Sequence, residues 1–148
     1  MNKIWNLPKI GFCSFVEIEE RRPVLLITST PAWNAVKENL RGLNVTRIIE
    51  VTEANTAYWD ILQSKTLAPH ARRHQAQVPG SAGVDNRNSA IVYAAGGGLV
   101  ADAAKYFATK LNLPLVCLPT ALSVDAFLTA ASGIRKDGCV YYIETKPP

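Results

Sequence analysis

The chain has 148 residues, of which 48% are hydrophobic and 19% charged, a composition typical of a globular protein with a core of its own. Its net charge of +4 is scattered, apart from Arg21-Arg22 and Arg72-Arg73, whereas a nucleic-acid binder more often carries a continuous basic stripe with exposed aromatic residues. No apolar stretch approaches the roughly 20 residues of a membrane span, and no signal peptide precedes the first elements. We therefore expect a cytoplasmic protein with neither nucleic-acid nor membrane partners.

The chain begins with a strand-helix-strand pattern. Val24–Thr28 is a continuous apolar run, as expected of a buried parallel strand. A helix is predicted to follow from a cap at Ser29 or Thr30, with Trp33, Val36 and Leu40 at helical spacing and Gly42 just past its end. Val45–Val51 is rich in β-branched residues and predicts a second strand.

The next segment, from Thr52 to Asn88, gives the weakest signal. Tyr58–Leu67 is predicted to be a helix, and the rest has the composition of loops. His70 and His74 are spaced as two metal ligands on one helix face would be, but no carboxylate is close to them in sequence. We interpret both as surface residues and expect no metal ligand in this chain.

The strongest pattern is an apolar strand that ends at three glycines and is followed at once by a helix. The strand covers Ser89 to Ala95, the glycines are Gly96, Gly97 and Gly98, and the helix covers Leu99–Leu111 and ends at Asn112. Such a turn presents bare backbone N–H groups at a helix N-terminus, where a phosphate can bind. The alternative is a merely flexible turn, and the Gly-x-Gly-x-x-Gly dinucleotide fingerprint is not met because Ala101 replaces its third glycine.

The C-terminal third predicts one more parallel strand and then a hairpin. Pro114–Leu118 is the strand, and Lys136-Asp-Gly138 is a hairpin turn between Thr129–Arg135 and Cys139–Glu144. Lys146-Pro-Pro148 has the composition of a linker. The expected fold class is therefore α/β, with a doubly wound, mainly parallel sheet and a C-terminal β-hairpin, in one domain over residues 1–148.

Polar residues follow the third and fourth strands, at the edge where such sheets bind ligands. Asp102 and Lys105 form either a solvated ion pair or, for Asp102, an acceptor for a ligand amide or hydroxyl. Thr120, Ser123 and Asp125 suit a ribose or a polyol, although Ser123 or Asp125 could equally cap a turn.

At these residues the chain resembles the iron-containing alcohol dehydrogenase superfamily, which includes glycerol dehydrogenase, glycerol-1-phosphate dehydrogenase and 3-dehydroquinate synthase. The resemblance rests on Gly-Gly-Gly-x-x-x-Asp-x-Ala-Lys, starting at Gly96, and on Pro-Thr-x-x-Ser-x-Asp-Ala, starting at Pro119. The second pattern is similar to the Pro-Thr-x-Ala-Ser-x-Asp of glycerol and glycerol-phosphate dehydrogenases, but Leu122 stands where that pattern has alanine. The Gly-Gly-Lys-Thr-Gly segment of the synthase is missing, which counts against that activity.

The resemblance implies roles for the candidate residues and a set of partners. Gly96, Gly97 and Gly98 would hold the pyrophosphate of NAD or NADP, and Asp102 would lie near the nicotinamide carboxamide. Thr120 and Ser123 would contact the cofactor, and Asp125 would reach a small polyol or polyol phosphate. The zinc or iron of the family would be held by a helical C-terminal domain that this chain does not contain.

Together these inferences predict the NAD(P)-binding domain of a metal-dependent polyol or polyol-phosphate dehydrogenase, inactive alone and open to homo-oligomerisation. Two alternatives remain: a stand-alone nucleotide-binding module, and a lyase similar to 3-dehydroquinate synthase. No acidic residue stands at Thr28-Ser29-Thr30, where many NAD-specific members of the family place an Asp, so NADP is permitted as well as NAD.

Overall fold

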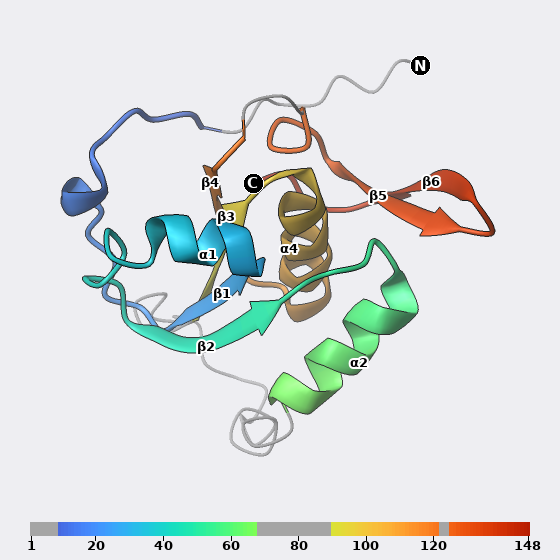
Figure 1. The fold of residues 1–148 in the computed structure, drawn as a ribbon, viewed down its shortest axis with the longest axis horizontal. Coiled ribbons are helices and arrows are strands. Elements are labelled where there is room, and N and C mark those ends of the chain that lie inside the picture. The colour runs from blue at the N-terminus through green and yellow to red at the C-terminus, as the bar shows by residue number, and fades with distance from the viewer. Residues whose placement is uncertain (1–8, 68–89, 122–124) are drawn as a thin grey trace, which may run out of the picture.

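A four-stranded parallel sheet forms the centre of the computed structural model, which describes residues 9–67, 90–121 and 125–148 (Figure 1). The strands lie in the order β2-β1-β3-β4 and comprise β1 (Val24–Thr28), β2 (Val45–Glu50), β3 (Ile91–Gly96) and β4 (Leu115–Pro119). Leu26 of β1 is in register with Ile48 of β2 and with Tyr93 of β3. The parallel sheet predicted from the sequence is confirmed, and β3 and β4 are neighbours within it.

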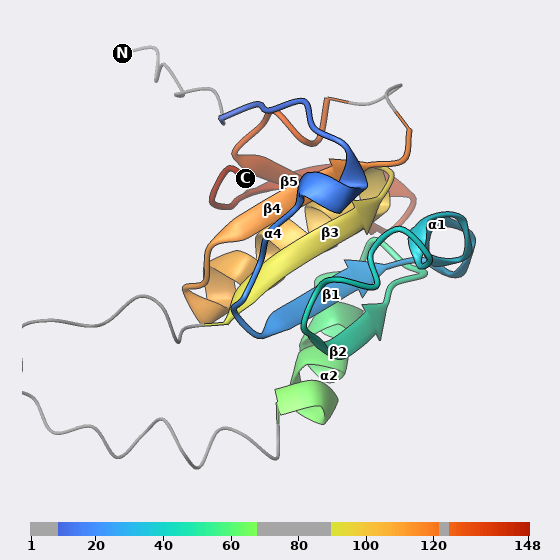
Figure 2. The same cartoon turned by 90° about the vertical axis from the view of Figure 1, so that its left-hand side faces the viewer.

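Helices cover both faces of the sheet, because successive residues of each strand point to opposite sides. On one face, Leu26 and Tyr93 belong to a core with Val36 of α1 (Thr30–Val36). On the other face, Ile27 belongs to a core with Trp59 of α2 (Thr56–Leu67) and with the residues of α4 (Gly98–Leu111). Figures 1 and 2 show α1 on one side of the sheet and α4 on the other, which is the doubly wound arrangement.

Helix α1 is shorter than the sequence predicted. It ends at Val36, and turns rather than helix lead to Gly42. Leu40 is nevertheless only 2% exposed, because its N–H group bonds to the carbonyl of Val36 at 3.2 Å and keeps the side chain facing the core. The apolar spacing therefore predicted the buried positions correctly, although it did not distinguish a helix from a series of turns.

Helix α4 is the most deeply buried helix of the described chain, and much of its buried surface is alanine. Ala101, Ala103, Ala104 and Ala108 have no solvent exposure, and the last three share a core with Ala94 of β3. Asn112 adopts the left-handed conformation and ends the helix, as predicted.

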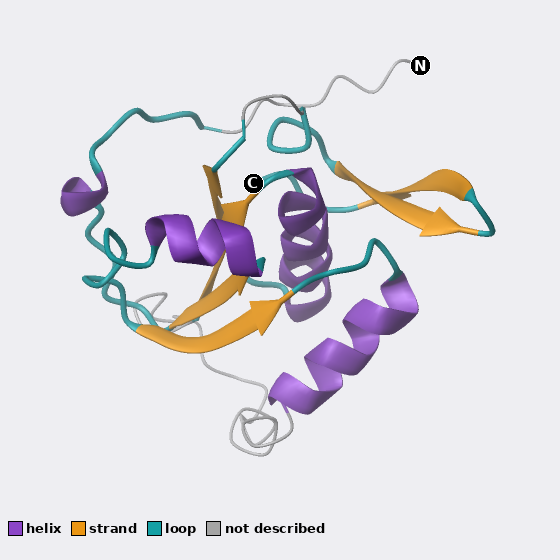
Figure 3. Ribbon diagram, in the orientation of Figure 1, coloured by secondary structure: helices purple, strands orange, loops and turns teal. Residues whose placement is uncertain are grey.

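The C-terminal residues form an antiparallel hairpin of β5 (Ala131–Lys136) and β6 (Cys139–Glu144), which extends from the body of the molecule (Figure 3). Asp137 and Gly138 both have positive φ angles, as a two-residue hairpin turn requires. The hairpin is fastened to the body near its turn: the Arg135 N–H group bonds to the Ala54 carbonyl at 2.7 Å. The Lys146 N–H group bonds to Thr109 Oγ1 at 2.8 Å, so the predicted linker begins packed against α4.

Candidate functional site

The candidate site lies at the carboxyl edge of the sheet, where β3 and β4 end. Gly96 and Pro119 are in register, and the Thr120 N–H group donates to the Gly96 carbonyl at 3.0 Å. The glycine turn and the Pro-Thr loop therefore meet, as the order of the strands predicted. Thr120 is exposed there, whereas Ser123 lies outside the described residues, as do His70 and His74.

The glycines of the turn serve different purposes. A Cβ atom on Gly96 would lie 2.5 Å from the Val100 side chain, so Gly96 is required for the helix to pack against the strand. A Cβ atom on Gly97 would find only the Ala121 methyl group, at 4.0 Å. Apart from the chain on either side of Gly97, no other atom of the described residues lies within 4 Å of that position.

Gly97 is also the N-cap of α4, and no side chain caps the helix there. The first N–H groups of a helix have no partner within the helix, and together with the helix dipole they favour an anion. The Gly97 backbone is extended, with a φ of −93°, so its conformation does not demand glycine. The open space and the uncapped helix are together the arrangement in which a phosphate can approach the backbone.

Asp102 and Lys105 form an ion pair on α4, but the pair is not solvated. The Lys105 side chain has no solvent exposure and that of Asp102 is 19% exposed, with Nζ and Oδ1 separated by 3.0 Å. Lys105 Nζ also donates to Thr129 Oγ1 at 3.2 Å and to the Ala131 carbonyl. Lys105 therefore joins α4 to the base of the hairpin, and its ammonium group is not available to a ligand.

The environment of Asp102 raises its pKa above the ordinary value. Burial is the main cause, and it outweighs the opposing effects of Lys105 and of the hydrogen bond from the Gly133 backbone. The negative charge of Asp125 raises the pKa of Asp102 further. The two carboxylates are therefore close enough to interact, although Asp102 comes from α4 and Asp125 from the loop after β4.

Asp102 and Asp125 line the same pocket, which we call the hairpin pocket. It has a volume of about 300 Å³, and its wall includes Gly98, Asp102, Asp125, Thr129, Gly133 and Tyr142. Asp125 is exposed, and its carbonyl accepts the Leu128 N–H group at 2.8 Å in a turn. The backbone of Asp125, rather than its side chain, makes that turn, and within the described ranges no hydrogen bond engages its carboxylate.

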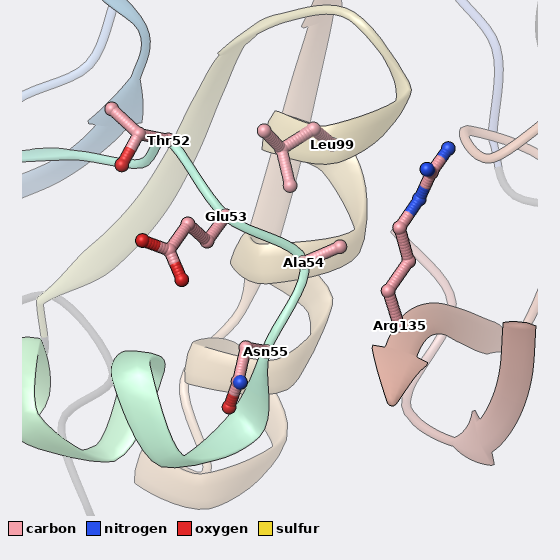
Figure 4. Close-up of a pocket in the computed structure, with 6 residues that line it drawn as sticks. All are labelled: Thr52, Glu53, Ala54, Asn55, Leu99 and Arg135. Atoms are coloured by element: carbon pink, nitrogen blue, oxygen red, sulfur yellow. The ribbon is translucent and has the colours of Figure 1, made fainter. Parts of the chain in front are cut away.

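A second pocket, which we call the loop pocket, lies beside the first and has a volume of about 500 Å³ (Figure 4). It is lined by Thr52, Glu53, Ala54, Asn55, Leu99 and Arg135. Sequence reasoning missed this pocket, because the loop after β2 carries no motif. The position of this loop could have indicated the pocket, because β2 ends at the same edge of the sheet as β3 and β4.

The described ranges hold no group of three or more His, Cys, Asp or Glu side chains that could bind a metal ion. The residues at the sheet edge thus fit an anion and hydroxyl groups, but they do not form a metal centre. Nor does any helix within residues 9–67, 90–121 and 125–148 have the length and apolarity needed to cross a membrane.

Comparison with known proteins identifies relatives. A family model described as iron-containing alcohol dehydrogenase matches residues 12–148. A segment of 58 residues is 36% identical to glycerol-1-phosphate dehydrogenase (NAD(P)+) of Bacillus velezensis, and it covers 39% of this chain and 15% of that protein.

The fold is similar to those of larger solved structures. A probable glycerol dehydrogenase from Sinorhizobium meliloti matches 86% of this chain with a TM-score of 0.61 and 21% identity. Glycerol dehydrogenase from Schizosaccharomyces pombe matches 85% with a TM-score of 0.58 and 20% identity. The chain spans 31% and 29% of those two proteins, so it corresponds to less than a third of either. Because the family model covers nearly all of the sequence, this chain belongs to the iron-containing alcohol dehydrogenase family.

Proposed function

We propose that this chain is the NAD(P)-binding part of a metal-dependent polyol or polyol-phosphate dehydrogenase, of the glycerol or glycerol-1-phosphate dehydrogenase kind. The observation that carries the proposal is the unoccupied space beside Gly97 at the uncapped start of α4. A glycine with a purely structural role is required because its φ angle is positive or because a neighbouring atom leaves no room for a Cβ atom. Neither reason applies to Gly97. A dinucleotide pyrophosphate fits the backbone donors and the space.

The remaining candidate residues take roles that agree with their positions. Asp102 lines the hairpin pocket beside Gly98, where its carboxylate accepts hydrogen bonds from a cofactor amide. Asp125 lies across the same pocket and is assigned to substrate hydroxyl groups. Thr120 is exposed beside the glycine turn and is assigned to the cofactor, as is Ser123, which lies outside the described residues.

The metal of the family is assigned to a part of the relatives that this chain does not span. Within the described residues no donor set suits zinc or iron. We therefore derive no catalytic step through a metal, and we assign to this chain cofactor binding and one contact to substrate.

A glycine pair tests the proposal. Gly97→Val should abolish binding of NADH and NADPH, measured by calorimetry, because a branched side chain fills the space that a phosphate needs. Gly42→Val is the matched control: Gly42 also has free space around it, neither glycine has a positive φ angle, and Gly42 lies far along the chain from the turn. Equal binding by wild type and Gly97→Val would show that the turn is only structural.

A further inference from the structure

The two pockets form one cleft along the first turn of α4. Ala54, Leu99 and Arg135 line both pockets, so the walls are shared rather than merely close. The cleft is electrostatically polarised. Asp102 and Asp125 line the hairpin pocket, and Arg135 lines both pockets.

Arg135 is held in place by its backbone, while its side chain remains available. Its N–H group donates to the Ala54 carbonyl at 2.7 Å, which fixes the start of the side chain against the loop after β2. The residue is exposed, and no ion pair to its guanidinium exists within the part of the chain that the structure describes. In Figure 4, Glu53 points away from Arg135, on the other side of Ala54.

The neighbouring cations do not share this position. Lys105 is buried and bonded to Asp102, Thr129 and Ala131. Lys136 follows Arg135 on β5, so its side chain leaves the opposite face of the hairpin, and it lines neither of the two pockets. Arg135 is thus the cation of the described residues that lines both pockets.

We propose that Arg135 binds a phosphomonoester in this cleft, while hydrogen-bond donors of the same or an adjoining ligand, hydroxyl or amide, face Asp102 and Asp125. An arginine guanidinium matches a phosphate with two parallel hydrogen bonds, and the two carboxylates repel a phosphate from the other end of the cleft. The inference rests on the proposed function and deepens it by naming the residue that binds the phosphate of a phosphorylated ligand. The phosphomonoester has two sources, the substrate and the 2′-phosphate of NADP.

Arg135→Gln tests the inference, with Lys136→Gln as the matched control for loss of one charge on the same strand. Binding of NADH, NADPH, glycerol and glycerol 1-phosphate is followed by two-dimensional amide NMR of the 148-residue chain, which also shows that each variant is folded. Arg135→Gln should weaken a phosphomonoester roughly tenfold, near the lower limit for a hydrogen bond to a charged group, because the site is open to water. Lys136→Gln should bind like wild type.

The four ligands separate the outcomes. If Arg135→Gln weakens the binding of glycerol 1-phosphate alone, the inference is supported and the phosphomonoester is that of the substrate. If it weakens the binding of NADPH alone, the inference is supported and the phosphomonoester is the 2′-phosphate of the cofactor. If Arg135→Gln weakens the binding of NADH and of NADPH equally, Arg135 contacts the pyrophosphate and the inference is overturned. It is also overturned if wild type binds neither phosphomonoester, or if Arg135→Gln binds both unchanged. If wild type binds glycerol 1-phosphate but neither dinucleotide, and Arg135→Gln weakens the binding of glycerol 1-phosphate, the proposed function fails while the inference stands.

Discussion

At Gly96 the missing side chain makes room for Val100, whereas at Gly97 it leaves space that no described residue fills. Gly96 is thus required by packing within the fold, whereas the absence of a side chain at Gly97 leaves room for a group from outside the fold. The sequence alone predicted the turn but not this division. The division depends on where the side chain of Val100 points, and that is fixed only once α4 packs against β3.

Gly96→Ala should destabilise the protein. The added methyl group meets the Val100 side chain well inside contact distance, and such overpacking costs about 1–3 kcal/mol. Urea unfolding of Gly96→Ala beside Gly97→Ala measures the difference. We expect the first to lower the free energy of unfolding and the second to leave it nearly unchanged, and an equal effect at both positions would contradict the division of roles.

Cysteine reactivity should follow burial. Burial raises the pKa of the Cys117 thiol to about 12, whereas Cys13 and Cys139 are exposed. At pH 8 the native protein should be alkylated by iodoacetamide at Cys13 and Cys139 and not at Cys117, because only the thiolate reacts. Peptide mass spectrometry reads out each site, and alkylation in urea is the control in which all three should react. Modification of native Cys117 at a rate similar to Cys13 would show that β4 opens readily.

Among the elements, β1 and the end of α4 were predicted closely, whereas the start of α2 was not. β1 was predicted residue for residue, and α4 ends at Asn112 as its sequence indicates. Helix α2 begins at Thr56, earlier than predicted, because the Asn55 side chain accepts the Ala57 and Tyr58 N–H groups at 2.9 and 3.3 Å. An Asn before a helical segment is a recognisable cap signal that the sequence analysis did not use.

The ion pair of Asp102 and Lys105 shows the limit of local reasoning. The spacing of three residues is the same for a solvated pair and for a buried one, so the sequence could not indicate that Lys105 has no exposure. Burial comes from the hairpin, which covers α4 from a distant part of the chain. The place of Arg135 in the site is likewise invisible in the sequence, because it follows from the contact of β5 with Ala54.

Lys105→Met should loosen the hairpin from α4. The substitution removes the donor to Thr129 and Ala131 and leaves Asp102 without its partner. We expect a loss of about 2–3 kcal/mol, below the value for a fully buried pair because Asp102 keeps some contact with water. In Lys105→Met, amide hydrogen exchange should become faster than in wild type in β5 and β6, and this acceleration should be larger than in β1. Lys110→Met on the exposed side of the same helix is the control, and equal protection in both variants would exclude this role of Lys105.

At the scale of the whole molecule, the proposed function assigns one side of a site to this chain. The sheet edge, the turn and the hairpin supply backbone donors, two carboxylates and Arg135, and no described cluster of side chains could hold a metal ion. The two glycerol dehydrogenase structures are about three times as long as the part that this chain matches. Cofactor binding and turnover should therefore be separable in this protein.

The 148-residue chain by itself should not oxidise glycerol, glycerol 1-phosphate or simple alcohols, with or without added zinc or iron. The reason is the lack of a metal donor set in the described residues, since a bound zinc or iron would supply the Lewis acid that a metal-dependent dehydrogenase needs. The appearance of reduced cofactor, followed by its absorbance, measures the activity. Metal-dependent turnover by rigorously purified chain would contradict the expectation.

The alanines of α4 have a consequence for mutational scanning. Ala103 and Ala104 face the core that contains Ala94, so a larger side chain at either position pushes the helix away from the strand. The start of the helix would shift with it, and the backbone donors beside Gly97 would move relative to the sheet edge. In a saturation screen for cofactor affinity, these alanines should therefore score like contact residues although they never touch the ligand. Reading such a screen correctly requires a parallel measurement of abundance or stability for every variant.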